Sequence, residues 1–167
     1  MLLGNKPNND AVPASESLVI QLMLQQRYAQ AYELLLAQQS HQTSAVYNMA
    51  LCLHWSGNFQ EALTRLESIQ TVQQMSSVNK VNAKSDLKEI INKQNLTDDY
   101  LHAMSDAYVK SFPSAASDAI VRLKTDCWLQ LGNYAQVIAV AAPIAHKGYR
   151  NITEALQIAN TKKDNGI

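Results

Sequence analysis

The chain has 167 residues, enough for one domain with a sizeable core, and its hydrophobic fraction of 47% is ordinary for a globular protein. Fourteen basic and fourteen acidic side chains give a formal net charge of zero, so the chain lacks the broad positive field that nucleic-acid backbones require. No stretch approaches the roughly 18 apolar residues that span a bilayer, and the short apolar start does not read as a secretion signal. We therefore expect a cytoplasmic protein that binds neither nucleic acid nor membrane.

The residue types that usually carry chemistry are scattered. Cys52 and Cys127 each lie within an apolar helical pattern, which predicts buried, reduced thiols. The four histidines have no metal-ligand spacing with one another or with either cysteine, and neither GxxxxGK[ST] nor GxGxxG occurs. The sequence therefore predicts no metal, no cofactor and no enzymatic activity.

Two helices are expected near the N-terminus, behind a tail. Residues 1–13 combine Gly4, Pro7 and Pro13 with Asn and Asp, so we expect a flexible tail there and a single domain over 14–167. Apolar residues at helical spacing predict a first helix after Ser15. A break at Gln26 then leads into a second helix.

The stretch 45–69 carries the clearest pattern, two amphipathic helices joined by Ser56-Gly57-Asn58. Gly57 is expected in the left-handed conformation that ends a helix and that disfavours residues with a Cβ. Gly57→Val should therefore destabilise the fold by roughly 1–3 kcal/mol.

The second half of the chain also predicts helices. Residues 70–96 are polar, with a short helix near 82–94, and Thr97-Asp98-Asp99 reads as the start of another helix over 97–111. Pro113 can open a long helix that ends before Gly132, and a helix kinked at Pro143 and a final helix from about 153 to 163 follow. No alternating pattern predicts strands, so the expected class is all-α.

Small residues and aromatics stand at defined places around Gly57: Ala50 and Ala62 where paired helices cross, and Phe59 two residues after the glycine. This pattern resembles the tetratricopeptide repeat, a helical hairpin of about 34 residues. The unit at 45–69 matches best, although Gln74 stands where the family has a closing proline.

Two further units match in part. Around Gly132 the aromatic Tyr134 is in place, and in the first hairpin Gln26 replaces the glycine. The turns at Gln26 and Gly57 lie about one repeat apart and those at Gly57 and Gly132 about two, so one divergent unit is expected between them. The resemblance thus implies a right-handed helical-hairpin solenoid, an α-α superhelix of three to four hairpins, with a C-terminal capping helix.

In this family the first helices of successive units line a concave groove that receives peptides. The resemblance implies a non-enzymatic adaptor that binds a protein or peptide partner in this groove, centred on Trp55, with one apolar and one polar half. The expected groove residues are Ile20, Met23, Leu24, Tyr47, Leu51, His54, Trp55, Arg122, Asp126, Leu129 and Gln130.

Three alternatives remain open at the level of sequence. The groove side chains could instead contact a neighbouring helix of the same chain. Bacterial secretion chaperones of similar length hold export substrates in such a groove, and a structural subunit would homodimerise through the same surface. Some members of the family grip a partner's terminal carboxylate; Asn48 matches one such position, but Glu16 and Ile20 stand where a lysine and an asparagine are needed, so that clamp is not expected.

Overall fold

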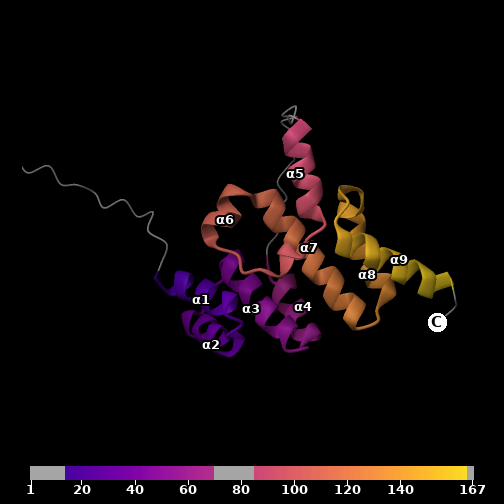
Figure 1. The fold of residues 1–167 in the computed structure, drawn as a ribbon. Helices are drawn as coiled ribbons and strands as arrows, with labels where there is room; N and C mark the ends of the chain where they lie inside the picture. Colours follow the sequence, from indigo (N-terminus) through magenta and orange to yellow (C-terminus); the bar gives the residue numbers. More distant parts are fainter. Residues whose placement is uncertain (1–13, 70–84, 165–167) are drawn as a thin grey trace, which may run out of the picture.

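The computed structural model describes residues 14–69 and 85–164, and over these ranges the chain is helical without a strand. The expected all-α class is confirmed (Figure 1). The tail predicted for residues 1–13 lies outside the described residues, as does most of the polar part of 70–96. Within the described residues no helix is both long enough and apolar enough to cross a membrane.

The first half of the chain forms two helical hairpins. Helices α1 (Ala14–Leu24) and α2 (Tyr28–Gln38) make the first, and α3 (Thr43–Trp55) and α4 (Phe59–Glu67) make the second. The second half contains a third hairpin of α7 (Pro113–Gln130) and α8 (Tyr134–Ala141). A 3₁₀ helix, η2 (Ala142–Lys147), continues α8 where the kink at Pro143 is predicted, and α9 (Arg150–Asp164) closes the chain.

The three hairpins turn in the same way. At Gly57 the amide N–H donates to the His54 carbonyl, and the next amide, of Asn58, donates to Leu53, at 3.0 and 2.9 Å. The amide pairs at Gln26-Arg27 and Gly132-Asn133 make the equivalent two bonds. This is the Schellman pattern, which needs a positive φ at its first residue. Gln26, Gly57 and Gly132 have φ of 59°, 81° and 69°, so the left-handed turn predicted at Gly57 is confirmed and Gln26 adopts it without being glycine.

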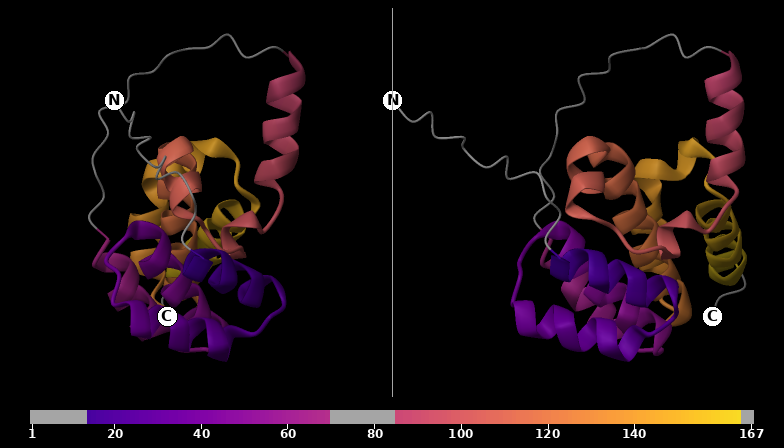
Figure 2. Two further views of the ribbon diagram at one scale, coloured as in Figure 1. Left: turned by 90° about the vertical axis from the view of Figure 1, so that its left-hand side faces the viewer. Right: turned by 60° about the vertical axis from the view of Figure 1, so that its left-hand side comes forward.

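The hairpins pack against one another in chain order. Helix α2 contacts α3, α4 contacts α7, and α8 contacts α9, in addition to the contacts within each hairpin. Because α4 lies directly against α7, the described residues 85–111 between them are not part of the row of hairpins (Figures 1 and 2).

The connecting chain is where the sequence-based expectation fails. Helix α5 (Ser85–Asn95) forms as predicted, but it stands away from the body and buries none of its side chains (Figure 2). The single helix predicted over 97–111 is wrong: the chain forms a 3₁₀ turn, η1 (Asp99–Leu101), an extended stretch, and then α6 (Asp106–Ser111). Among the described residues 85–112, no hairpin stands between the second and third ones, so the divergent unit expected from helices near 82–94 and 97–111 is wrong.

Tertiary contacts explain the failure at 97–111. Asp98 and Asp99 accept bonds from Arg150 and Arg122, at 2.6 and 2.5 Å, instead of facing the first turn of an α-helix. Ser105 is extended and its hydroxyl caps α6, accepting from the Tyr108 amide at 3.0 Å. The acidic pair is thus bound by arginines of α7 and α9, and rules based on neighbouring residues cannot predict such long-range contacts.

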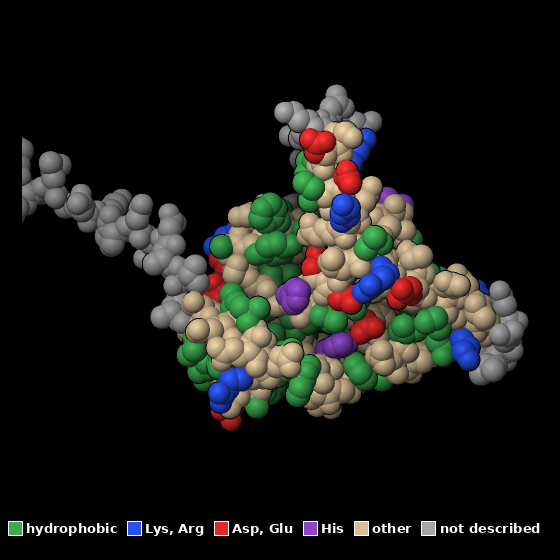
Figure 3. All heavy atoms as spheres, viewed as in Figure 1, with side chains coloured by type: hydrophobic (Ala, Val, Ile, Leu, Met, Phe, Trp, Pro, Cys, Tyr) green, Lys and Arg blue, Asp and Glu red, His purple; other side chains and the backbone are tan. Residues whose placement is uncertain are grey.

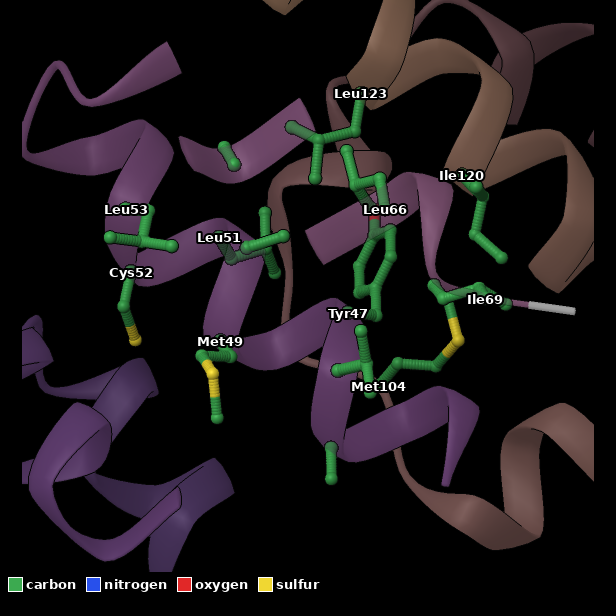
Figure 4. Close-up of a cluster of buried hydrophobic side chains, with 14 of the residues drawn as sticks. Tyr47, Met49, Leu51, Cys52, Leu53, Leu66, Ile69, Met104, Ile120 and Leu123 are labelled. Atoms are coloured by element: carbon green, nitrogen blue, oxygen red, sulfur yellow. The ribbon is translucent and has the colours of Figure 1, made fainter. Parts of the chain in front are cut away.

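One large core runs through the first two hairpins and α7. The alanines predicted at the helix crossings, Ala50 and Ala62, are fully buried in it, as is Ala31 of the first hairpin. Figure 4 shows how Tyr47, Leu66, Ile69, Met104 and Leu123 converge in this core from different parts of the chain. Two smaller apolar clusters join α8, η2 and α9 to α7.

Candidate functional site

The inner face of the helical row consists of the sides of α1, α3 and α7 that face residues 97–111, called here the covering segment. Its η1 turn contacts α7, and α6 contacts both α3 and α7. Much of the surface that α1, α3 and α7 share is therefore covered by the chain itself.

Polar side chains of the inner face hold the main chain of the covering segment. The Asn48 side-chain amide makes two bonds with Met104: Nδ2 donates to its carbonyl and Oδ1 accepts from its N–H, both at 2.8 Å. The Tyr47 hydroxyl donates to the Tyr100 carbonyl. Glu16 on α1 accepts from the Asp106 N–H at 2.6 Å and from the Ser44 hydroxyl at 3.3 Å.

Arg122 on α7 contacts both α9 and the start of the covering segment. Its guanidinium donates to the Asp99 carboxylate at 2.5 Å, to the Thr97 carbonyl at 2.7 Å and to the Asn151 side chain at 2.8 Å. It also lies over the rings of Tyr100 and Tyr149, at 4.5 and 4.4 Å. All of these contacts are internal, which makes Arg122 a structural residue in this conformation.

Burial shifts the acid–base behaviour of this region. It raises the pKa of the Tyr47 hydroxyl well above its usual value, and it raises the pKa of Tyr100, to which nearby Asp126 and Asp98 contribute. Both phenols therefore stay neutral over the physiological range and act as hydrogen-bonding or stacking groups rather than as general bases.

An open cleft adjoins the covered inner face. It lies beside α3, has a volume of about 340 Å³ and is lined mostly by apolar and aromatic side chains. Its lining residues are Tyr28, Leu51, His54, Trp55, Phe59, Leu101 and Gln130. We call this the Trp55 cleft.

Aromatic contacts fix the walls of the Trp55 cleft. Trp55 stacks on Tyr28 with ring centroids 4.6 Å apart and an interplanar angle of 27°, while its side chain stays 61% exposed. His54 meets Phe59 edge to face at 5.3 Å, and its Nε2 lies 2.5 Å from Asp126 Oδ2 on α7. The cleft thus combines an exposed indole with a polar bridge across the inner face.

The eleven predicted groove residues fall into three groups. Leu51, His54, Trp55 and Gln130 line the cleft, and Asp126 lies directly behind His54. The remaining six do not line the cleft. Met23, Tyr47 and Arg122 are buried, Ile20 and Leu129 are half-buried, and Leu24 is 71% exposed.

Four residues depart from the predicted roles. Tyr47 and Arg122 are covered by the chain's own residues 97–111, and Met23 is buried in the large core. Leu129 packs against the α8–α9 cluster rather than facing the cleft. The alternative in which groove side chains contact their own chain therefore holds for Tyr47 and Arg122.

Three cleft residues are absent from the predicted set. Tyr28 and Phe59 follow the turns, where the repeat pattern predicts packing within each hairpin, but both are partly exposed and line the cleft. Leu101 comes from η1, and no local pattern points to it, because only the return of the chain across α3 and α7 brings it to the cleft.

Comparisons of the chain with protein-family models, with curated proteins and with solved structures found no match.

The His, Cys, Asp and Glu side chains are potential metal ligands, and the two thiols are also potential nucleophiles. Within residues 14–69 and 85–164, no group of three or more His, Cys, Asp or Glu side chains is arranged to hold a metal ion. Both cysteines are buried as free thiols, and burial raises the pKa of each to about 12. Neither thiol is a ready nucleophile at neutral pH.

Proposed function

We propose that this chain is a non-enzymatic protein-interaction module whose hairpins stack as in the tetratricopeptide family and whose partner binds at the Trp55 cleft. Two features support the stacking. The three turns share one hydrogen-bond pattern, and the helices contact one another in the order α2–α3, α4–α7 and α8–α9. A cytoplasmic location belongs to the same proposal, since two buried free thiols suit a reducing compartment.

The exposed yet immobilised indole of Trp55 carries the proposal. Stacking on Tyr28 holds the ring in place, although more than half of the side chain is in contact with solvent. A ring that is already ordered loses little side-chain entropy when a partner covers it, and tryptophan is enriched among residues that dominate binding energies.

The size and chemistry of the cleft support one class of partner. A volume of about 340 Å³ is at the small end of ligand pockets and suits one or two apolar or aromatic side chains. His54 and Gln130 supply hydrogen-bonding groups at its edge. The best fit is an apolar anchor from an amphipathic helix or an extended peptide of a protein partner.

Selection from a random peptide library displayed on phage tests this function. Wild-type protein should enrich peptides with a shared apolar or aromatic anchor, and Trp55→Ala should weaken their binding about tenfold or more. Ile158→Ala is the matched control, because Ile158 is an exposed apolar residue on α9, outside the cleft. Peptides that bind the Trp55→Ala and wild-type proteins equally well would remove the Trp55 cleft from the proposal.

A second function, self-association, is favoured by α5. Leu87, Ile90 and Ile91 are exposed apolar residues at helical spacing on α5. This helix stands away from the body (Figure 2), and Figure 3 shows hydrophobic side chains on its surface. An isolated helix of 11 residues is marginal in water, so contact with a second copy would stabilise it. Light scattering over a range of concentrations should then show a dimer that Ile90→Lys abolishes, and a monomer at every concentration would exclude it.

A further inference from the structure

The inner face contacts residues 97–111 in the way that a peptide-binding groove contacts its ligand, through hydrogen bonds from side chains to the main chain. Four of its side chains contact main-chain groups: Tyr47 the Tyr100 carbonyl, Asn48 both groups of Met104, Arg122 the Thr97 carbonyl, and Glu16 the Asp106 N–H. These side chains come from α1, α3 and α7, so they converge on one stretch of backbone from all three inner helices.

Two side chains of the covering segment are buried, as the anchor residues of a bound peptide are. Tyr100 and Met104 point into the core and are 5% and 4% exposed, and the chain between them is extended at His102, with φ of −95° and ψ of 152°. Figure 4 shows Met104 beside Tyr47 and Ile69. Recognition of main-chain groups by fixed polar side chains, with side chains held in apolar sites, is how proteins hold extended peptides.

The attachment of the covering segment to the rest of the molecule differs at its two ends. At one end it continues from α5, which buries no side chain and is tied to the body through the Asn95 amide and the Lys147 carbonyl, at 2.8 Å. At the other end α6 leads directly into α7. Helix α5 therefore contributes little to the position of residues 97–104. The contacts with the inner face are what mainly hold these residues in place.

We propose that the inner face is a peptide-binding groove which the chain keeps occupied with its own residues 97–111. A partner peptide that carries an aromatic residue and, four positions later, a long unbranched apolar residue competes with this segment for the groove. This inference rests on the proposed role in protein interaction and adds a built-in competitor, which lowers the apparent affinity for such a partner in proportion to the fraction of molecules that are open.

The competition can be measured with the full-length chain and a labelled synthetic peptide of residues 97–111. Met104→Ala in the protein weakens the chain's own segment while leaving every groove side chain in place. Fluorescence anisotropy should show the peptide binding to the Met104→Ala protein at least about tenfold more tightly than to wild type. Adding Asn48→Ala to that protein should remove the gain, because Asn48 holds the peptide backbone.

Controls separate the outcomes. A peptide with aspartate in place of Met104 should not bind, and circular dichroism checks that each variant is folded. If Met104→Ala does not fold, Met104→Val removes less volume and takes its place. Equal affinity for wild-type and Met104→Ala proteins, or affinity that does not depend on Asn48, would overturn the inference. If Trp55→Ala weakens peptide binding but Met104→Ala does not strengthen it, the proposed function stands and only the competition by residues 97–111 is excluded.

Discussion

The side-chain amide of Asn48 donates one hydrogen bond to Met104 and accepts another from it, although Met104 lies 56 positions later in the chain. The two bonds are 2.8 Å long and the asparagine is buried. This pair joins the middle of α3 to the extended part of the covering segment, and it defines how the inner face of the helical row is filled.

Asn48→Ala should destabilise the fold by about 2–4 kcal/mol, because it leaves the buried N–H and carbonyl of Met104 without partners. Urea unfolding followed by circular dichroism measures the change. Asn92→Ala on the exposed α5 is the matched control and should change stability by less than about 0.5 kcal/mol. Equal effects of the two variants would show that the Asn48 bonds do not form.

Gln26→Gly should stabilise the protein by about 0.5–1 kcal/mol, since Gln26 occupies the left-handed conformation that glycine adopts without strain. The converse change, Gly57→Val, should cost roughly 1–3 kcal/mol. Apart from its two neighbours in the chain, no residue would lie within 4 Å of a Cβ at position 57, so the cost is conformational rather than a clash. Thermal unfolding measures both changes. Gln30→Gly inside α2 serves as control and should be destabilising by about 1 kcal/mol.

Much of the fold could be predicted because its signals are local. The helices around Gly57 and Gly132 follow from apolar spacing and from glycines at left-handed positions, and both turns form as expected. Gln26 shows the limit of this reasoning: the turn needs a positive φ, which packing of α1 against α2 imposes on a residue that does not favour it.

The covering of the inner face could not be predicted from local pattern, because contacts between distant residues produce it. One signal is present in the sequence. Helix α3 is apolar on nearly all sides, and residues 44–53 are all buried, which is typical of a helix enclosed by its own protein. The repeat pattern places Tyr47 and Leu51 in a groove for a partner, whereas this all-round apolar character indicates burial within the chain.

Arg122→Leu should destabilise the protein by about 3–5 kcal/mol, because it removes a buried guanidinium that donates to the Asp99 carboxylate and is the donor to the Thr97 carbonyl. The neighbouring pair of Arg150 and Asp98 is exposed, so Arg150→Leu should leave the midpoint of thermal unfolding within error. A large effect of Arg150→Leu, or none of Arg122→Leu, would contradict this division between buried and exposed pairs.

Alkaline pH should weaken the fold through its two thiols. Burial raises the pKa of Cys52 and Cys127 from 9.0 to about 12, so the folded state keeps protons that the unfolded state releases. This stabilisation is complete below about pH 9 and is lost as the pH rises towards 12. Urea titrations across this range should show the decline, with a shallower slope when both cysteines are alanine.

The same burial predicts slow thiol chemistry. Near neutral pH a thiol reagent should modify both cysteines only as fast as the protein opens, and at once in denaturant. Immediate reaction of the native protein would show that one of the two thiols is accessible.

Hydrogen exchange at the Met104 amide tests most directly whether the chain fills its own inner face. In the wild-type protein this amide should exchange slowly, because its hydrogen is bound to Asn48 in the interior, and Asn48→Ala should abolish the protection while the amides of α3 stay protected. Exchange of the wild-type Met104 amide at the rate of an unstructured peptide would contradict the account.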